Sequence, residues 1–145
     1  MLGLTPLGII HTAISLVAVG TGIVSLIRER EIRYETLLGR WYTWTTVLTC
    51  LTGFPIMQHG GFGKPHALGV LTLVLLGIAV VAGRGIGFGW TRRYVETVAY
   101  SATFLFHLIP GVVETTTRIP PAAPFIRDRE GPELQAVTGL LFLAF

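Results

Sequence analysis

The chain has 145 residues, of which 51% are hydrophobic and 13% are charged, and its mean hydropathy is +0.65. About a quarter of the residues in soluble domains are charged, so this composition excludes an ordinary soluble protein and predicts a membrane protein. The formal net charge of +3 does not indicate a nucleic-acid partner, because ten of the eleven basic residues are arginines in short loops between apolar runs.

Five apolar segments follow one another along the chain. The first four cover residues 4–27, 41–58, 66–83 and 94–113, and each is close to the ~20 residues that a membrane-spanning helix needs. The fifth, residues 134–145, is equally apolar but only twelve residues long, so we expect the first half of a fifth helix, with a re-entrant segment as the alternative. Together these segments predict an all-α, up-and-down helix bundle that forms a single transmembrane domain over residues 1–145.

The placement of arginines predicts the orientation of this bundle. The loops at residues 28–40 and 84–93 hold seven basic residues, and the remaining loops hold four. We therefore expect the first two loops to face the cytoplasm of a bacterial inner membrane, with the N-terminus and the proline-rich loop 114–133 outside. Aromatic residues that favour the membrane interface fall at the expected cytoplasmic ends: Trp41, Tyr42, Trp44, Trp90 and Tyr94.

All four histidines fall in the outer half of the predicted bundle. His11 and His107 lie about 10 Å and about 9 Å below the outer helix ends at 1.5 Å per residue, His66 opens the third helix, and His59 precedes it. Helical spacing places His107 on one stripe with Glu96, Tyr100, Thr103, Gly111 and Glu114, and His11 with Ser15, Ala18, Gly22 and Ser25. Both stripes must face the bundle interior, because lipid offers no partner for polar atoms.

A histidine at this depth has three explanations: ligation of a metal or haem iron, proton transfer to a quinone or cavity, or a hydrogen bond that packs two helices. We predict a haem b held between His11 and His107, with the hydroxyls of Thr103 and Tyr100 orienting it. A copper, zinc or iron site formed by His11, His107 and His66 is the alternative within the same class. A solvated side chain at the headgroup boundary is the leading interpretation of His66 and His59 taken singly.

The chain resembles uncharacterised small multi-pass bacterial inner-membrane proteins in three features: GRWY at residues 39–42, a glycine-rich turn into His66, and an inward histidine on the first and fourth helices. It is more distantly similar in architecture to the b561-type cytochromes, four-helix proteins that carry haem between histidines. This resemblance implies the fold and a haem site. The chain has one layer of histidines instead of two, so transmembrane electron transfer through two stacked haems is not expected.

We therefore expect a small redox or quinone-linked membrane protein with a haem b or metal site near the outer face. The alternative is a non-catalytic accessory subunit of a larger membrane complex, or a homo-oligomer, in which the histidines only join helices. A permease is a third interpretation, but no pair of broken helices marks a substrate site. The chain has no HExxH or GxSxG motif, so its status as an enzyme stays open.

Overall fold

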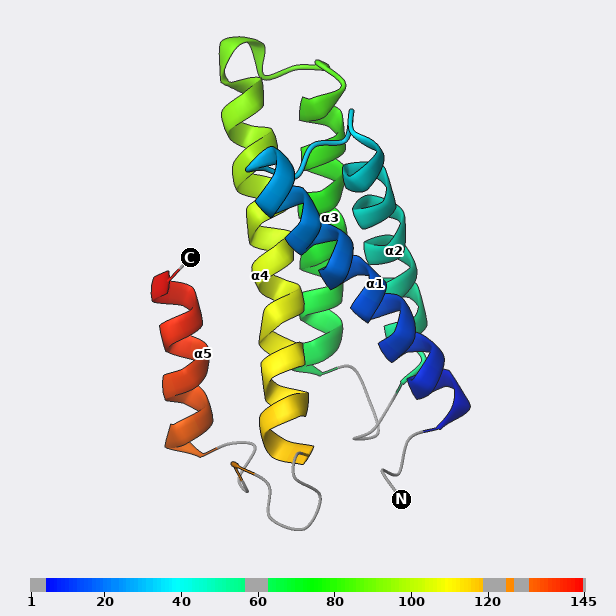
Figure 1. Cartoon of the computed structure of the whole chain (residues 1–145), viewed down its shortest axis with the longest axis vertical. Coiled ribbons are helices and arrows are strands. Elements are labelled where there is room, and N and C mark those ends of the chain that lie inside the picture. The colour runs from blue at the N-terminus through cyan, green and yellow to red at the C-terminus, as the bar shows by residue number, and fades with distance from the viewer. Residues whose placement is uncertain (1–4, 57–62, 119–124, 127–130, 145) are drawn as a thin grey trace. The chain divides into compact units, whose positions relative to one another are not determined.

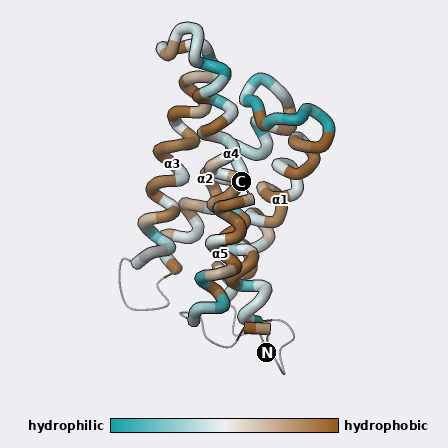
Figure 2. The backbone as a smooth tube through the Cα atoms, turned by 90° about the vertical axis from the view of Figure 1, so that its left-hand side faces the viewer, coloured by the Kyte–Doolittle hydropathy of each residue, from teal (hydrophilic) through white to brown (hydrophobic). Residues whose placement is uncertain are grey.

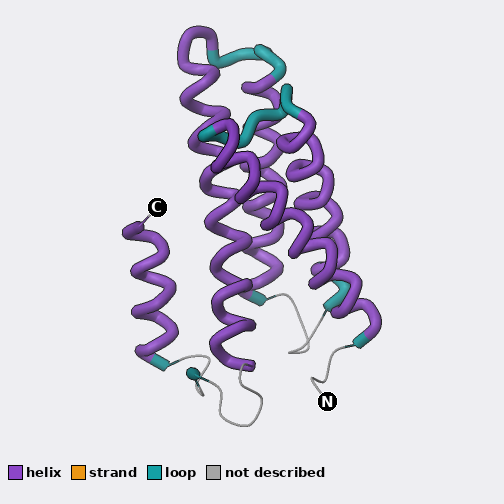
Figure 3. Tube along the Cα trace, in the orientation of Figure 1, coloured by secondary structure: helices purple, strands orange, loops and turns teal. Residues whose placement is uncertain are grey.

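The computed structural model describes residues 5–56, 63–118, 125–126 and 131–144. Within these ranges every regular element is helical and there is no strand (Figure 3). Figure 1 shows the elements in chain order: α1 (Pro6–Glu29), α2 (Leu37–Gly53), α3 (Lys64–Gly83), the short 3₁₀ turn η1 (Gly89–Thr91), α4 (Arg92–Arg118) and α5 (Pro132–Ala144). The predicted all-α class is therefore confirmed.

The helix limits follow from local capping chemistry. The Thr5 hydroxyl accepts a hydrogen bond from the Gly8 N–H (3.1 Å), and Pro6 occupies the first helical position, so α1 begins there. The Thr36 hydroxyl accepts from the Gly39 N–H (3.0 Å), and α2 therefore begins at Leu37. The predicted start at residue 41 came too late, because the apolar pattern hid this cap.

The other predicted limits differ from the structure by a few residues. α1 ends at Glu29 instead of residue 27, and α3 begins at Lys64 instead of 66. α2 ends at Gly53, and residues 57–58 lie outside the described part of the chain. α4 extends the predicted 94–113 in both directions. It continues through Pro110, and the polar residues that follow Val113 are still helical. α5 covers 132–144 instead of 134–145.

The chain divides into two compact units. The larger one, residues 4–104, contains α1, α2, α3 and the first half of α4. The smaller one, residues 105–145 with residues 1–3, contains the second half of α4 and α5. Each unit is described below by itself.

Within the described residues, three helical segments are long and apolar enough to cross a membrane, namely 6–29, 65–83 and 89–118. In the larger unit, polar groups lie inside and apolar groups lie outside. Its buried polar residues are Ser25, Thr43, Thr45, Thr46, Thr49, His66, Thr72, Glu96 and Thr103, whereas large apolar side chains such as Leu16, Ile27, Leu51 and Val74 are exposed. Figure 2 shows the hydrophilic residues gathered at the turn between α1 and α2. This distribution is what a lipid environment favours.

Candidate functional site

The centre of the larger unit is a cluster of four hydroxyl-bearing residues from α2 and α4, which we call the tyrosine–threonine cluster: Tyr42, Thr43, Tyr100 and Thr103. The Tyr42 hydroxyl lies 3.0 Å from Thr103 Oγ1, and the Tyr100 hydroxyl lies 2.8 Å from Thr43 Oγ1. Both tyrosines are fully buried, and their rings meet edge to face with centroids 6.0 Å apart.

The directions of these hydrogen bonds follow from proton counting. A threonine hydroxyl has one proton, and Thr43 donates it to the Gly39 carbonyl (2.7 Å) while Thr103 donates to the Tyr100 carbonyl (2.8 Å). Each tyrosine must then be the donor to the threonine on the facing helix. The two tyrosine protons therefore join α2 and α4 in opposite directions.

α1 packs closely against this cluster. A Cβ atom at Gly22 would lie 2.8 Å from ring atoms of Phe104 and 3.2 Å from the Tyr42 ring, so only glycine fits there without displacing an aromatic ring. Ala18 and Ser25 of the same stripe are also fully buried. The predicted inward direction of this stripe is confirmed for these residues, as it is for Glu96, Tyr100 and Thr103 on α4.

His11 lies near the start of α1 and binds the end of α2. Its Nδ1 is 3.1 Å from Thr52 Oγ1, and Thr52 directs its own proton to the Leu48 carbonyl (2.7 Å). Nδ1 must therefore carry the proton, because the Thr52 oxygen can only accept. The resulting tautomer has a lone pair on Nε2. Histidine ligands of metals adopt such a form when the other ring nitrogen donates a hydrogen bond to a neighbouring group.

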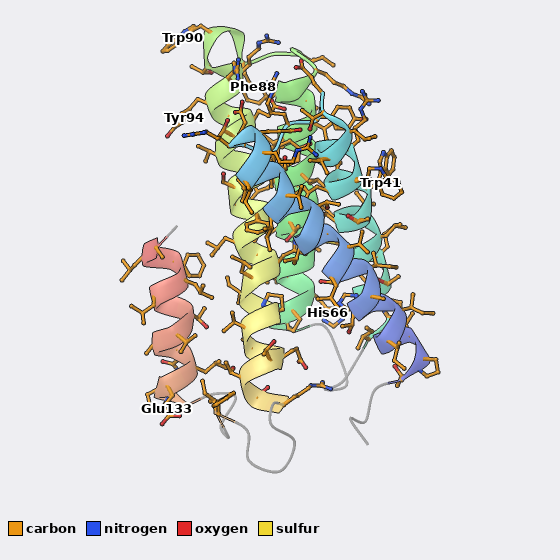
Figure 4. The ribbon with its side chains drawn as sticks, viewed as in Figure 1. Trp41, His66, Phe88, Trp90, Tyr94 and Glu133 are labelled. Carbon is orange, nitrogen blue, oxygen red and sulfur yellow. The ribbon has the colours of Figure 1, made fainter. Side chains whose placement is uncertain are left out.

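Both ring nitrogens of His66 are bound to the backbone. Nδ1 accepts from the Gly63 N–H (3.2 Å), and Nε2 donates to the Phe54 carbonyl (3.1 Å). The imidazole also stacks on the Phe54 ring, with centroids 6.4 Å apart. Figure 4 labels His66 at the start of α3. It joins the end of α2 to the start of α3, and the predicted ligation of a metal by His66 would break one of these two hydrogen bonds.

His107 is buried in the smaller unit, on the second half of α4. The predicted haem between His107 and His11 would involve both units, and that pairing stays a prediction. His59 lies outside the described residues. Within the described part of the chain, no three or more His, Cys, Asp or Glu side chains are grouped as a metal site requires.

A second polar cluster lies where the loop between α1 and α2 meets α4. Glu96 is buried and accepts a hydrogen bond from the Tyr34 N–H (3.2 Å), and a Cβ atom at Gly83 would lie 2.5 Å from its Oε1. One turn away, Glu31 binds Arg93 (2.9 Å) and accepts from the Thr97 hydroxyl (3.1 Å). The sequence placed Glu96 on an inward stripe but did not reveal that this loop folds onto α4.

Other groups of the protein, mostly hydroxyls and backbone atoms, thus bind the side chains of the two clusters and the two histidines of the larger unit. Of these side chains, His11 has the clearest capacity for an external ligand, at Nε2. We compared the chain with protein-family models, with curated proteins and with solved structures, and none of them matched.

Proposed function

We propose that this chain is a non-catalytic accessory protein of a bacterial inner membrane, which packs as a helix bundle within a larger membrane complex. The observation that carries the proposal is the use of the interior polar groups. Tyr100 and Thr103, which were predicted to orient a haem, are instead bound to α2 through Thr43 and Tyr42. A core in which polar groups bind each other across helices serves packing.

In this proposal α1, α2, α3 and α4 each cross the membrane, with the N-terminus outside. α2 has 17 residues, which is at the lower end of the range for a spanning helix. The exposed aromatic residues Trp41, Trp90 and Tyr94 support this arrangement because they lie at the same end of the larger unit as the arginine-rich loops (Figure 4). α5, with 13 residues, covers about 20 Å, which is too short to span by itself.

The proposal is tested on protein purified in mild detergent from its native membrane. We expect a colourless preparation without stoichiometric metal, judged by a reduced-minus-oxidised visible spectrum and elemental analysis, that elutes together with other membrane proteins. Sharp reduced bands, or one metal ion per chain, would contradict the accessory function. Elution as an isolated single chain after mild crosslinking would contradict membership of a complex.

The second candidate function is the predicted haem or metal site, in which His11 and His107 are ligands and the reaction is electron transfer linked to a quinone. The protonation of His11 at Nδ1, with Thr52 as its acceptor, favours this candidate, because it directs a lone pair from Nε2. If it is correct, His11→Ala and His107→Ala both lose the chromophore or metal. His66→Ala is the matched control, and it retains the cofactor unless the three-histidine metal site is the correct form.

A further inference from the structure

The turn between α3 and α4, residues 84–93, differs from every other described connection in its exposure. All residues from 84 to 90 are exposed. Gly85, Gly87 and Gly89 have φ angles of 73°, 70° and 48°, and Phe88 between them has a φ of 59°. Left-handed backbone is unfavourable for phenylalanine, so this turn holds an aromatic side chain outward at a conformational cost.

The turn also exposes three large apolar side chains. Ile86 is 59% exposed, Phe88 43% and Trp90 96%. Figure 4 shows Phe88, Trp90 and Tyr94 at one end of the larger unit. Trp90 continues at helical spacing into Tyr94 and Val98, which are exposed on α4. The apolar surface of the turn is therefore continuous with a helix face that lies in lipid when α4 spans the membrane.

Two guanidinium groups flank this apolar turn. The Arg84 guanidinium donates to the Tyr34 hydroxyl (3.0 Å) and lies 5.0 Å from the centre of the Tyr34 ring. The Arg92 guanidinium folds over Gly85, where a Cβ atom would lie 3.0 Å from its Nη1. Arg93 pairs with Glu31, but among the described residues neither Arg84 nor Arg92 has a carboxylate within 4.0 Å. Their positive charges are held in place without neutralisation.

We propose that the turn at residues 84–93 binds the headgroup of an anionic phospholipid. Arg84 and Arg92 donate hydrogen bonds to the phosphate, and Phe88 and Trp90 pack at the boundary between headgroups and acyl chains. A lipid fits better than an acidic protein, because the turn that carries the two guanidinium groups also exposes apolar side chains that continue onto the lipid-facing side of α4. The inference rests on the membrane location proposed above, but not on the accessory function.

The test is native mass spectrometry of the protein released from detergent with phosphatidylglycerol or phosphatidylcholine. We expect retained phosphatidylglycerol to exceed phosphatidylcholine. We expect R84Q/R92Q to lower the phosphatidylglycerol affinity about thirtyfold, since each of the two basic side chains contributes about fivefold near an anionic surface. R28Q/R30Q removes the same charge from exposed positions near the same end but outside the turn, and we expect a loss several times smaller, because these arginines do not contact the phosphate. Equal losses in the two double variants would overturn the site.

Two further measurements keep the result interpretable. R84K/R92K retains the charge but not the paired N–H donors, so it should recover only part of the affinity, and it replaces R84Q/R92Q if the latter does not fold. Excess inorganic phosphate should not displace the lipid, and displacement would overturn the lipid assignment. If the chain does not sediment with membranes, the membrane location itself fails. If it does sediment but retains the two lipids equally, only this inference fails.

Discussion

Gly39 lies where the loop between α1 and α2 folds back on the first turn of α2. It is the glycine of the GRWY segment, and a Cβ atom there would overlap the backbone carbonyl of Arg33. Its own N–H is bound to the Thr36 hydroxyl and its carbonyl accepts from Thr43. Gly39 therefore connects the loop, the helix cap and the tyrosine–threonine cluster, and the absence of a side chain is what permits this.

We expect Gly39→Ala to lower the free energy of unfolding by about 2 kcal/mol or more, because backbone atoms must move to admit the methyl group. Gly20→Ala is the control, since a Cβ atom at Gly20 has no neighbour within 4 Å, and helix propensity predicts that it raises the free energy of unfolding by up to about 1 kcal/mol. Unfolding by SDS in mixed micelles measures both. Similar stability of the two variants would show that the loop does not pack on α2 as described.

At the scale of helices, most threonine hydroxyls donate their protons within their own helix, and only their oxygens remain available to neighbouring helices. Thr45, Thr49 and Thr52 each donate to a carbonyl one turn earlier on α2. This leaves their oxygens as acceptors, which is how Thr52 receives the proton of His11. Contacts between helices then depend on donors from other residue types, chiefly tyrosine and histidine.

A double-mutant cycle tests the link between α2 and α4. Tyr42→Phe and Thr103→Val each remove one partner of the buried hydroxyl pair, and we expect a coupling energy of about 0.6 kcal/mol, the average for hydrogen bonds between membrane helices. In the control cycle, Tyr42→Phe is combined with Thr12→Val. The Thr12 hydroxyl donates to the Gly8 carbonyl near the start of α1. That cycle should be additive. Equal coupling in both cycles would refute a direct hydrogen bond.

At the scale of the molecule, the arrangement of charge is the basis of the proposed orientation. Arg28, Arg30, Arg33 and Arg40 lie at or beside the loop between α1 and α2, and Arg84, Arg92 and Arg93 lie at the turn between α3 and α4. The exposed ones include Arg28, Arg30, Arg84, Arg92 and Arg93. In the proposed topology these arginine-rich loops remain on the cytoplasmic side of the membrane.

Labelling of single cysteines measures this orientation. In a Cys50→Ser background, Ile86→Cys and Phe125→Cys place one reactive thiol in each of two exposed positions. We expect a membrane-impermeant maleimide to label the position 125 variant in intact cells, and the position 86 variant only after the membrane is opened, because residue 86 lies in an arginine-rich loop. The reverse pattern would invert the proposed topology.

The sequence alone predicted the apolar segments, their helical form and the inward direction of the buried part of each polar stripe, although Gly111 of the α4 stripe is exposed. Hydropathy and helical periodicity are local properties, so they survive folding unchanged. The starts of the helices were harder to predict, as the four-residue error at the start of α2 illustrates. The Thr36 cap acts through a backbone N–H, which leaves little trace in an apolar pattern.

Only the tertiary structure decided how the interior polar groups are used. Periodicity placed Tyr100 and Thr103 on the inside, but it could not reveal that Thr43 and Tyr42 bind them. His66, for which a solvated side chain was the leading interpretation, is instead buried and bound to Gly63 and Phe54. The partners of Glu96 and His66 are largely backbone atoms, which every residue carries and no sequence motif marks. Pairings between distant positions arise from packing, and packing is a property of the folded chain as a whole.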